Sequence, residues 1–291
     1  MDNNHSKGIA IVGANGFIGK ALNGYLQAKD IATTSFTSAD PLIIDSQLPE
    51  NLSQSSHIIW CASRVNPVSA TQDPLLVERE LQEWSSFLDA VDKIDSSKPT
   101  IIFLSSGGCT YSSSDIPFNE TGIAEGTNKY GKLKVVMEQK LLLRDIPSII
   151  LRVANVYGPN QPHGRGQGVI AEWLYALSKN KSLDVYGSTD SFRDYIYIED
   201  LCDAIFNCLK LNANRNIYNI GSGTAINLEK VLNTISRFSS GALNVRRFES
   251  RTSDRSGYYL DIRLFKSKTG WAPNYTLETG IAKMLGLTND Q

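Results

Sequence analysis

The sequence predicts an α/β protein, with a doubly wound parallel β-sheet as its main domain and a smaller C-terminal α/β domain. Three observations predict it. Short and almost unbroken apolar segments alternate with segments of helical periodicity, which is typical of parallel strands buried between two layers of helices. A glycine-rich turn joins the first strand to the first helix. After Gly158 the alternation gives way to a polar, glycine-rich loop.

The expected elements follow the chain in order. Strands are expected within 7–12, 31–36, 41–46, 56–63, 99–106 and 146–159, and helices after Gly13 and within 74–94 and 128–144. A helix within 169–180 and shorter segments at 183–187, 192–210 and 216–223 follow. We expect residues 1–158 and a returning part of about 183–220 to form the main domain, and about 159–182 and 221–291 to form the smaller one.

The bulk composition excludes several classes of protein. The 291 residues are 41% hydrophobic and carry a net charge of −1, so a core can form and no basic surface for nucleic acid is expected. No apolar run approaches the ~18 residues of a membrane span, and no secretory signal is visible at the start. The four cysteines show no CxxC spacing, so neither a metal site nor a disulfide framework is expected. We therefore expect a soluble cytoplasmic protein.

Three glycines between the first strand and the first helix predict a dinucleotide site. Gly13, Gly16 and Gly19 form G-x-x-G-x-x-G. The first permits the tight turn, the second lets a pyrophosphate approach the backbone, and the third lets the helix pack on the strand. The helix N-terminus then faces the phosphates. The main domain is therefore expected to be a Rossmann-type NAD(P)-binding domain, with Asn15, Phe17 and Ile18 of the same turn also contacting the cofactor.

The sequence does not choose between NAD and NADP. The end of the second strand lacks the acid that usually holds the ribose 2′-hydroxyl of NAD, and the nearest acid, Asp40, lies late. A clamp for the 2′-phosphate of NADP is not evident either, because no Lys or Arg occurs between Lys29 and Arg64. Asp45, expected at the end of the third strand, is interpreted as a contact to the adenine amino group or as a strand-end cap.

Tyr130 and Lys134 form a candidate catalytic pair. Their Y-x-x-x-K spacing places both side chains on one face of a helix. A free Tyr has a pKa of about 10, so it needs electrostatic help to act as a base near pH 7, and a neighbouring ammonium and a nicotinamide cation supply such help. Other Tyr-x-x-x-Lys pairs occur in the chain, but only this pair follows the "SSGGCTY" strand end.

Taken together, the motifs of this chain resemble the extended short-chain dehydrogenase/reductases, specifically the nucleotide-sugar epimerase/dehydratase family. The matching pieces occur in family order over nearly the whole chain. They are "GANGFIG", "SSGGCTY", "YGKLK", "LRVANVYGP", "GQGVI", "LDVYG", "FRDYIYIEDL", "RTSD" and "TGWAPNYTLETGI".

The resemblance implies further site residues. Arg193 is expected to bind the substrate diphosphate, because its planar fork can make paired hydrogen bonds to phosphate oxygens; without the resemblance, Arg193 and Asp194 would be interpreted as a surface ion pair. The other expected cofactor contacts are Cys61, Ala62, Ser63, Ser105, Val153 and Ala154. The other expected substrate contacts are Gly107, Asn155, Val185, Tyr186, Arg251 and Asp254. No metal ligand is expected.

The sequence departs from the family at the catalytic hydroxyl. Gly107 stands where the family usually carries Ser or Thr. We expect Ser106 to supply the hydroxyl, with Thr110 as the second candidate. A helix Asn that often contacts the cofactor is also missing, and Glu80 or a neighbour replaces it. Residues 107–109 contain no carboxylate, so the usual 4,6-elimination of the related dehydratases is not expected.

The sequence therefore favours an NAD(P)-dependent nucleotide-sugar 4-epimerase that acts through a 4-keto intermediate. An NADPH-dependent 4-keto sugar nucleotide reductase is the alternative, and a non-catalytic dinucleotide-binding protein is a further one. A UDP-sugar is the expected substrate. The resemblance also implies a homodimer formed through the helices within 74–94 and 128–144.

Overall fold

The centre of the protein is a six-stranded parallel sheet with the strand order β10-β5-β4-β3-β1-β2. The computed structural model of the chain describes residues 8–95, 97–112, 115–164, 166–239, 241–249 and 257–287. The strands of the sheet are β1 (Ile9–Val12), β2 (Thr33–Phe36), β3 (His57–Trp60), β4 (Thr100–Ser106), β5 (Ser148–Val153) and β10 (Asn216–Ile220). The order reverses direction at β1 and β3, as in a Rossmann-type sheet, so the predicted fold class is confirmed.

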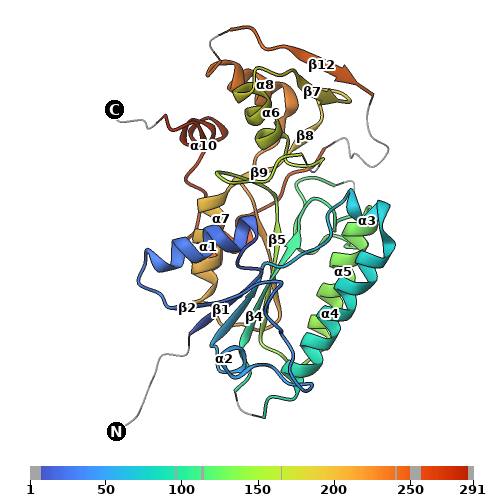
Figure 1. Cartoon of the computed structure of the whole chain (residues 1–291), viewed down its shortest axis with the longest axis vertical. Helices are drawn as coiled ribbons and strands as arrows, with labels where there is room; N and C mark the ends of the chain where they lie inside the picture. Colours follow the sequence, from blue (N-terminus) through green and yellow to red (C-terminus); the bar gives the residue numbers. More distant parts are fainter. Residues whose placement is uncertain are drawn as a thin grey trace.

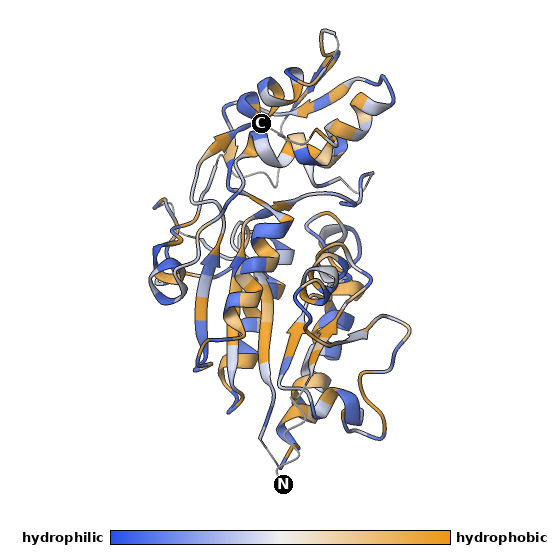
Figure 2. Ribbon diagram, turned by 90° about the vertical axis from the view of Figure 1, so that its left-hand side faces the viewer, coloured by the Kyte–Doolittle hydropathy of each residue, from blue (hydrophilic) through white to orange (hydrophobic). Residues whose placement is uncertain are grey.

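Helices cover both faces of this sheet (Figure 1). On one face lie α1 (Phe17–Gln27) and α7 (Ile198–Cys208), and on the other lie α3 (Ser69–Gln72), α4 (Pro74–Asp92) and α5 (Lys129–Leu142). Alternate strand residues serve the two faces: Ile102 and Leu104 belong to one buried cluster, whereas Ile101 and Phe103 belong to the other. The strands are accordingly apolar along most of their length, as their colour shows (Figure 2).

The helix that carries the Tyr–Lys pair begins at a defined cap. Asn128 is the N-cap of α5, and its side chain accepts a hydrogen bond from the Gly131 N–H at 2.8 Å. Gly131 also touches the backbone of Cys109, so that a Cβ on this glycine would overlap the Cys109 carbonyl. This contact explains the glycine in "YGKLK" and holds the start of α5 against the turn that follows β4.

The prediction of a strand within 41–46 is wrong. This segment forms a turn closed by paired backbone hydrogen bonds between Ile44 and Gln47, at 2.8 and 2.9 Å. Asp45 and Ser46 lie in the left-handed region with φ of +50° and +63°, which a strand does not contain. The third strand of the sheet in chain order is instead β3, and α2 (Glu50–Ser53) precedes it.

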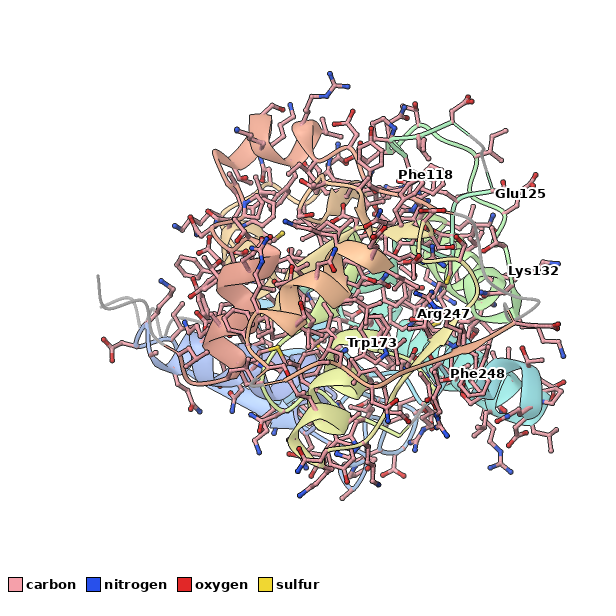
Figure 3. The ribbon with its side chains drawn as sticks, turned by 90° about the horizontal axis from the view of Figure 1, so that it is seen from above. Phe118, Glu125, Lys132, Trp173, Arg247 and Phe248 are labelled. Atoms are coloured by element: carbon pink, nitrogen blue, oxygen red, sulfur yellow. The ribbon has the colours of Figure 1, made fainter. Side chains whose placement is uncertain are left out.

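A smaller part lies above the carboxyl edge of the sheet (Figure 1). It contains α6 (Val169–Ser178), β7 (Leu183–Tyr186), β8 (Phe192–Arg193), β11 (Ile226–Asn227), α8 (Leu228–Ser236), β12 (Val245–Phe248) and α10 (Leu277–Met284). Figure 3 labels Trp173 of α6 and Phe248 of β12 in this part. The indole N–H of Trp173 donates to the Asp184 carbonyl of β7 at 2.9 Å, which ties α6 to the neighbouring strand pair.

The chain passes from the smaller part back to the central sheet after β7, which pairs with β12 in the smaller part. The return begins where β9 (Tyr195–Tyr197) pairs with β6 (Asn155–Tyr157), and it continues through α7 to β10. Near the end of the chain, α9 (Arg263–Thr269) packs against β10. Both domains are therefore built from more than one chain segment.

Candidate active site

The carboxyl ends of β3, β4 and β5 open into a cleft of about 1810 Å³ between the sheet and the smaller part. Most of the side chains predicted from the sequence line it. They are Gly16, Phe17, Ile18, Cys61, Ala62, Ser63, Ser105, Ser106, Tyr130, Lys134, Val153, Ala154, Asn155, Tyr186 and Arg193. Gly13, Asn15, Gly19, Asp45, Gly107 and Val185 are not among the lining residues. Arg251 and Asp254 lie outside the described residues.

The glycine turn fits the diphosphate of a dinucleotide. Gly13 has a φ of +87°, and a Cβ on it would lie 2.7 Å from the Ala62 nitrogen. Gly16 caps α1 and donates its N–H to the Gly13 carbonyl at 3.0 Å. The first turn of α1 carries no acidic residue, so the positive end of the helix dipole is not offset there. The cradle thus offers backbone close to a ligand and a helix N-terminus for phosphate, as NAD(P) requires.

The first acid after β2, Asp40, lies in the turn that follows the strand. The N–H groups of Gly13 and Ala14 both donate to the Phe36 carbonyl, at 2.8 and 3.1 Å, so the glycine turn lies directly against this strand end. Asp40 folds back and accepts from the Thr37 N–H at 2.7 Å and from its hydroxyl at 2.8 Å. These hydrogen bonds lower the pKa of Asp40. A turn that sequence spacing did not reveal therefore brings a carboxylate next to the strand end.

Tyr130 and Lys134 lie on successive turns of α5 at the wall of the cleft. The Lys134 ammonium is 5.6 Å from the centre of the Tyr130 ring. Burial raises the pKa of Tyr130, and the neighbouring Cys109 and Glu80 raise it further. Burial lowers the pKa of Lys134, while Glu80 acts in the opposite direction. In the ligand-free protein Tyr130 is therefore protonated at neutral pH, the state in which it donates rather than accepts a proton.

The structure distinguishes between the two predicted hydroxyls. Ser106 ends β4 and lines the cleft. Thr110 is fully buried, and its hydroxyl donates to the Ser106 carbonyl at 2.5 Å. The Thr110 hydroxyl therefore closes the turn after β4, whereas Ser106 is the one that faces the cleft.

Gly107 and Ser105, which flank Ser106 in the chain, make contacts inside the fold. Gly107 donates its N–H to the Val153 carbonyl at 2.8 Å, and a Cβ on it would lie 2.6 Å from the Leu260 Cδ1 atom. A Ser or Thr at this position would have to displace the end of the Leu260 side chain. The Ser105 hydroxyl donates to Glu138, whose carboxylate is bound by Arg152 at 2.6 Å. Ser105 can reach a cofactor only by its other atoms.

Tyr258 is a cleft residue that the sequence did not reveal. It is buried and lines the cleft beside the turn after β4, with the Arg193 guanidinium 5.9 Å from its ring centre. A Cβ on Gly108 would overlap its phenol. Tyr258 follows the RTSD motif but is not part of it, and only the long-range fold brings it to Gly108, so no spacing pattern predicts this contact.

Arg193 and Asp194 do not form a surface ion pair. Asp194 is fully buried and accepts from the N–H and hydroxyl of Ser222, both at 2.7 Å, and from the N–H of Leu260 at 3.1 Å. Burial raises its pKa. Asp194 thus ties together the segments around the cleft, while the neighbouring Arg193 lines the cleft and offers a cation to a substrate.

The rim of the cleft is aromatic at the β7–β12 pair. Tyr186 stacks on Phe248 with ring centres 5.0 Å apart, and both rings are partly exposed. The neighbouring Val185 is buried. The side chain of Arg246 pairs with Asp184 at the same rim, with an N–O distance of 2.8 Å. An exposed aromatic pair with a nearby cation suits a flat ligand group.

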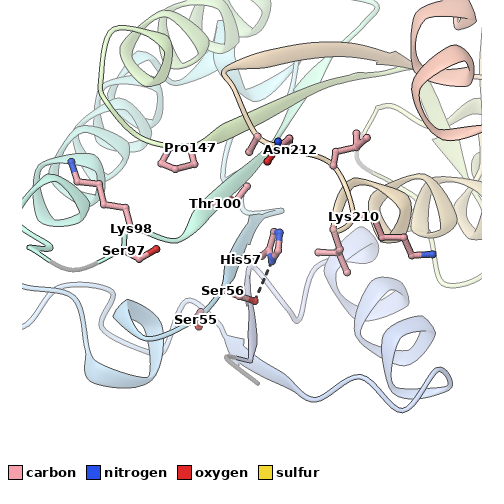
Figure 4. Close-up of a pocket in the computed structure, with 12 residues that line it drawn as sticks. Ser55, Ser56, His57, Ser97, Lys98, Thr100, Pro147, Lys210 and Asn212 are labelled. Atoms are coloured by element: carbon pink, nitrogen blue, oxygen red, sulfur yellow. Dashed lines mark hydrogen bonds between the residues drawn. The ribbon is translucent and has the colours of Figure 1, made fainter. Parts of the chain in front are cut away.

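Among the residues that the structure describes, no group of His, Cys, Asp and Glu is arranged to hold a metal ion. Within the same residues, no helix is long and apolar enough to cross a membrane. A second hollow lies at the opposite end of the sheet, where β3 and β4 begin, with a hydrogen-bond contact of 3.1 Å between His57 and Ser56 (Figure 4). It is separate from the Tyr–Lys cleft.

The fold and the cleft together define the class. A Rossmann-type sheet with a glycine cradle and a Tyr–Lys pair at its carboxyl edge is an extended short-chain dehydrogenase/reductase. A sequence model of the NAD-dependent epimerase/dehydratase family matches residues 9–221, and the chain belongs to this family of enzymes.

Known relatives differ in their reactions. A dTDP-4-dehydro-6-deoxyglucose reductase of Escherichia coli is 32% identical over 257 residues, which cover 78% of this chain and 80% of the relative. A UDP-glucose 4-epimerase of Mycoplasma pneumoniae is 28% identical over 219 residues, covering 66% of this chain and 64% of the relative. The chain is thus a member of a group of nucleotide-sugar epimerases, reductases and dehydratases.

Solved structures share the fold. The UDP-glucose 4-epimerase of Thermotoga maritima, with UDP-glucose, superposes with a TM-score of 0.85 at 21% identity, covering 96% of this chain and 98% of that one. The RMD protein of Pseudomonas aeruginosa, with NADPH, gives a TM-score of 0.82 at 20% identity, covering 97% of this chain and 98% of that one. At these identities the likeness concerns the fold.

Proposed function

We propose that this protein reduces the C4 keto group of a sugar nucleotide with NAD(P)H. The observation that carries the proposal is that Tyr130 and Lys134 line one cleft together with Gly16 of the glycine turn and Arg193. Bound NAD(P)H supplies the hydride that reaches C4. The protein's own groups then have to place the sugar, supply one proton to O4 and hold the diphosphate.

Each of these tasks has a candidate residue. Tyr130 donates the proton to O4, and its raised pKa keeps it protonated for this step. Lys134 sets the electrostatic environment of the tyrosine from the next helical turn. Ser106, at the end of β4, donates a hydrogen bond to the same oxygen. These hydroxyls polarise the keto group before the hydride arrives.

The nucleotide end of the substrate is assigned to the smaller part. Arg193 is the proposed ligand of the diphosphate, because its guanidinium lines the cleft and is not paired with Asp194. Tyr186, on the exposed aromatic rim, is the proposed contact to the base. Asn155, exposed in the cleft at the start of β6, is the proposed contact to the sugar. The diphosphate thus lies between the rim and the Tyr–Lys pair.

One observation favours reduction over epimerisation. The relative from Escherichia coli, whose name states a reductase, aligns over 80% of its length. A UDP-hexose 4-epimerase is the second candidate, and the epimerase relative from Mycoplasma pneumoniae supports it.

The two candidates are separated by one set of assays. Purified protein is incubated with NADH or NADPH and a 4-keto-6-deoxy sugar nucleotide, and in parallel with UDP-glucose and NAD. The proposal expects stoichiometric oxidation of the reduced cofactor in the first reaction and no UDP-galactose in the second. Formation of UDP-galactose without net cofactor consumption would support the epimerase instead. Turnover in neither assay would count against both.

A further inference from the structure

Glu80 of α4 is a buried carboxylate placed between the cleft wall and the Tyr–Lys helix. Its oxygens are held from two sides. Oε1 accepts from the Ser63 hydroxyl at 2.8 Å and faces the Lys134 ammonium at 3.5 Å. Oε2 accepts from the backbone N–H groups of Arg64 at 2.7 Å and Val65 at 3.0 Å. Glu80 is not among the cleft-lining residues, and its carboxylate lies behind the wall formed by residues 63–65.

Among the described residues, two carboxylates act on the Lys134 ammonium. Its side chain is 2% exposed, and the ring centre of Phe103 lies 5.2 Å from the ammonium. The titratable groups that act on it are Glu80 from α4 and Glu138 from its own helix, with Tyr130 on the preceding turn.

The second carboxylate is already neutralised. Glu138 is bound by the guanidinium of Arg152 at 2.6 Å and by the Ser105 hydroxyl. Cys109 acts on Tyr130 rather than on the lysine. Glu80 is therefore the counter-charge of Lys134.

We propose that Glu80 is a positioning residue, which keeps the Lys134 ammonium charged and fixed against the wall formed by residues 63–65. The proposal rests on the proposed function, in which Lys134 acts on Tyr130. A buried cation without a partner loses its charge or leaves the site, because taking it out of water costs several kcal/mol. The hydrogen bonds from Ser63, Arg64 and Val65 hold the carboxylate in place, so the cleft wall and the catalytic lysine are aligned by the same group.

The direct test measures the charge state of Lys134 in the ligand-free protein. Protein with ¹³C-labelled lysine side chains is titrated by NMR, and the Lys134 signal is assigned by its loss in Lys134→Arg. Glu80→Gln keeps the shape of the side chain and removes its charge. Because Glu80 raises the pKa of Lys134, we expect this variant to lower that pKa by about one unit or more.

The matched control is Glu83→Gln. Glu83 lies on the same helix and pairs with the side chain of Arg64 at 3.1 Å, but it is about half exposed. The Glu83→Gln variant should leave the pKa of Lys134 unchanged. If Lys134 has the same pKa in Glu80→Gln and in Glu83→Gln, the proposal is overturned.

A second variant keeps the test decisive if Glu80→Gln does not fold. Ser63→Ala removes one of the hydrogen bonds that hold the Glu80 carboxylate in place, so the carboxylate is fixed less firmly beside the Lys134 ammonium. We expect the pKa of Lys134 to fall in Ser63→Ala, and an unchanged value would contradict the proposal. The titration needs neither substrate nor cofactor, so it gives its result even if every sugar nucleotide fails as a substrate and the proposed function is wrong.

Discussion

The phenol of Tyr258 occupies the space that a side chain at position 108 would need. A Cβ on Gly108 would lie 2.5 Å from the Tyr258 Cζ atom and 2.8 Å from Cε1. Tyr258 belongs to the C-terminal part of the chain, whereas Gly108 follows β4 of the central sheet. The glycine therefore permits a distant aromatic ring to close the cleft beside the predicted active-site hydroxyl.

Gly108→Ala should destabilise the protein because the new methyl group meets the ring of Tyr258. Overpacking of this kind costs roughly 1–3 kcal/mol, and thermal unfolding with a measured enthalpy would show it. Gly24→Ala is the control, because Gly24 lies within α1 and a Cβ there has nothing within 4 Å. Alanine should stabilise that helix by about 0.5–1 kcal/mol. Equal effects of the two variants would argue against the contact.

Ser106→Ala should lower the rate of keto reduction by a factor on the order of 10² or more, because it removes a hydrogen-bond donor to O4. Thr110→Val is the matched change, and its effect should be on stability, since the Thr110 hydroxyl closes the turn at the Ser106 carbonyl. Steady-state kinetics and thermal unfolding of both variants check the assignment. A rate loss confined to Thr110→Val would show that the donor is misassigned.

The two directions of the reaction should depend on pH in opposite ways. Burial raises the pKa of Tyr130, so the tyrosine stays protonated through neutral pH and loses its proton only under alkaline conditions. Reduction, which needs the protonated form, should hold its rate at neutral pH and fall as pH rises. Oxidation of the C4 alcohol, which needs a base, should rise over the same range. Parallel profiles of the two initial rates would contradict this role of Tyr130.

The protein should prefer NAD(H) to NADP(H). The carboxylate of Asp40 lies at the end of β2, which hydrogen-bonds to the glycine turn. A carboxylate there accepts from a ribose 2′-hydroxyl and repels a 2′-phosphate. Fluorescence titration with NADH and NADPH measures the preference, and Asp40→Ala should reduce it about tenfold or more. Tighter binding of NADPH by the unaltered protein would refute this reading of the turn.

A homodimer is expected through α4 and α5, which lie side by side on the outer face of the sheet (Figure 1). Leu133, Met137 and Leu141 of α5 are already buried within the chain, whereas Val136 is only half-buried. Light scattering should give twice the mass of the chain at micromolar concentration. Val136→Asp should shift the measured mass towards that of the monomer, because the dimer would bury an unpaired charge. A monomeric unaltered protein would reject the interface.

The sequence predicted the parts of the fold that local patterns determine. Apolar runs and helical periodicity located the strands and helices around Gly13 and Tyr130, because burial on two faces leaves a continuous apolar signal. The same signal was misleading at 41–46, where Leu42, Ile43 and Ile44 suggest a strand but the backbone turns at Asp45. A short apolar run does not reveal whether its backbone pairs with a sheet.

The remaining site features depend on contacts between distant segments. Tyr258 meets Gly108, and Glu80 meets Lys134, across long stretches of chain. Asp40 reaches the end of β2 through a turn closed by its own side chain. Neither periodicity nor motif spacing encodes such contacts, because each depends on where the completed fold brings two segments together.

The position of β10 has a consequence for synthesis of the chain. The sheet ends in β10, which pairs with β5 although about sixty residues of sequence separate the two strands. While a ribosome adds residues 154–220, at 5–20 residues per second, β5 remains an open edge for roughly 3–13 seconds. Its buried run, SIILRV, is the kind of segment that pairs with other chains when it is left open. The nascent protein therefore passes through an interval in which the edge of β5 is open to pairing with other chains, until β10 is made.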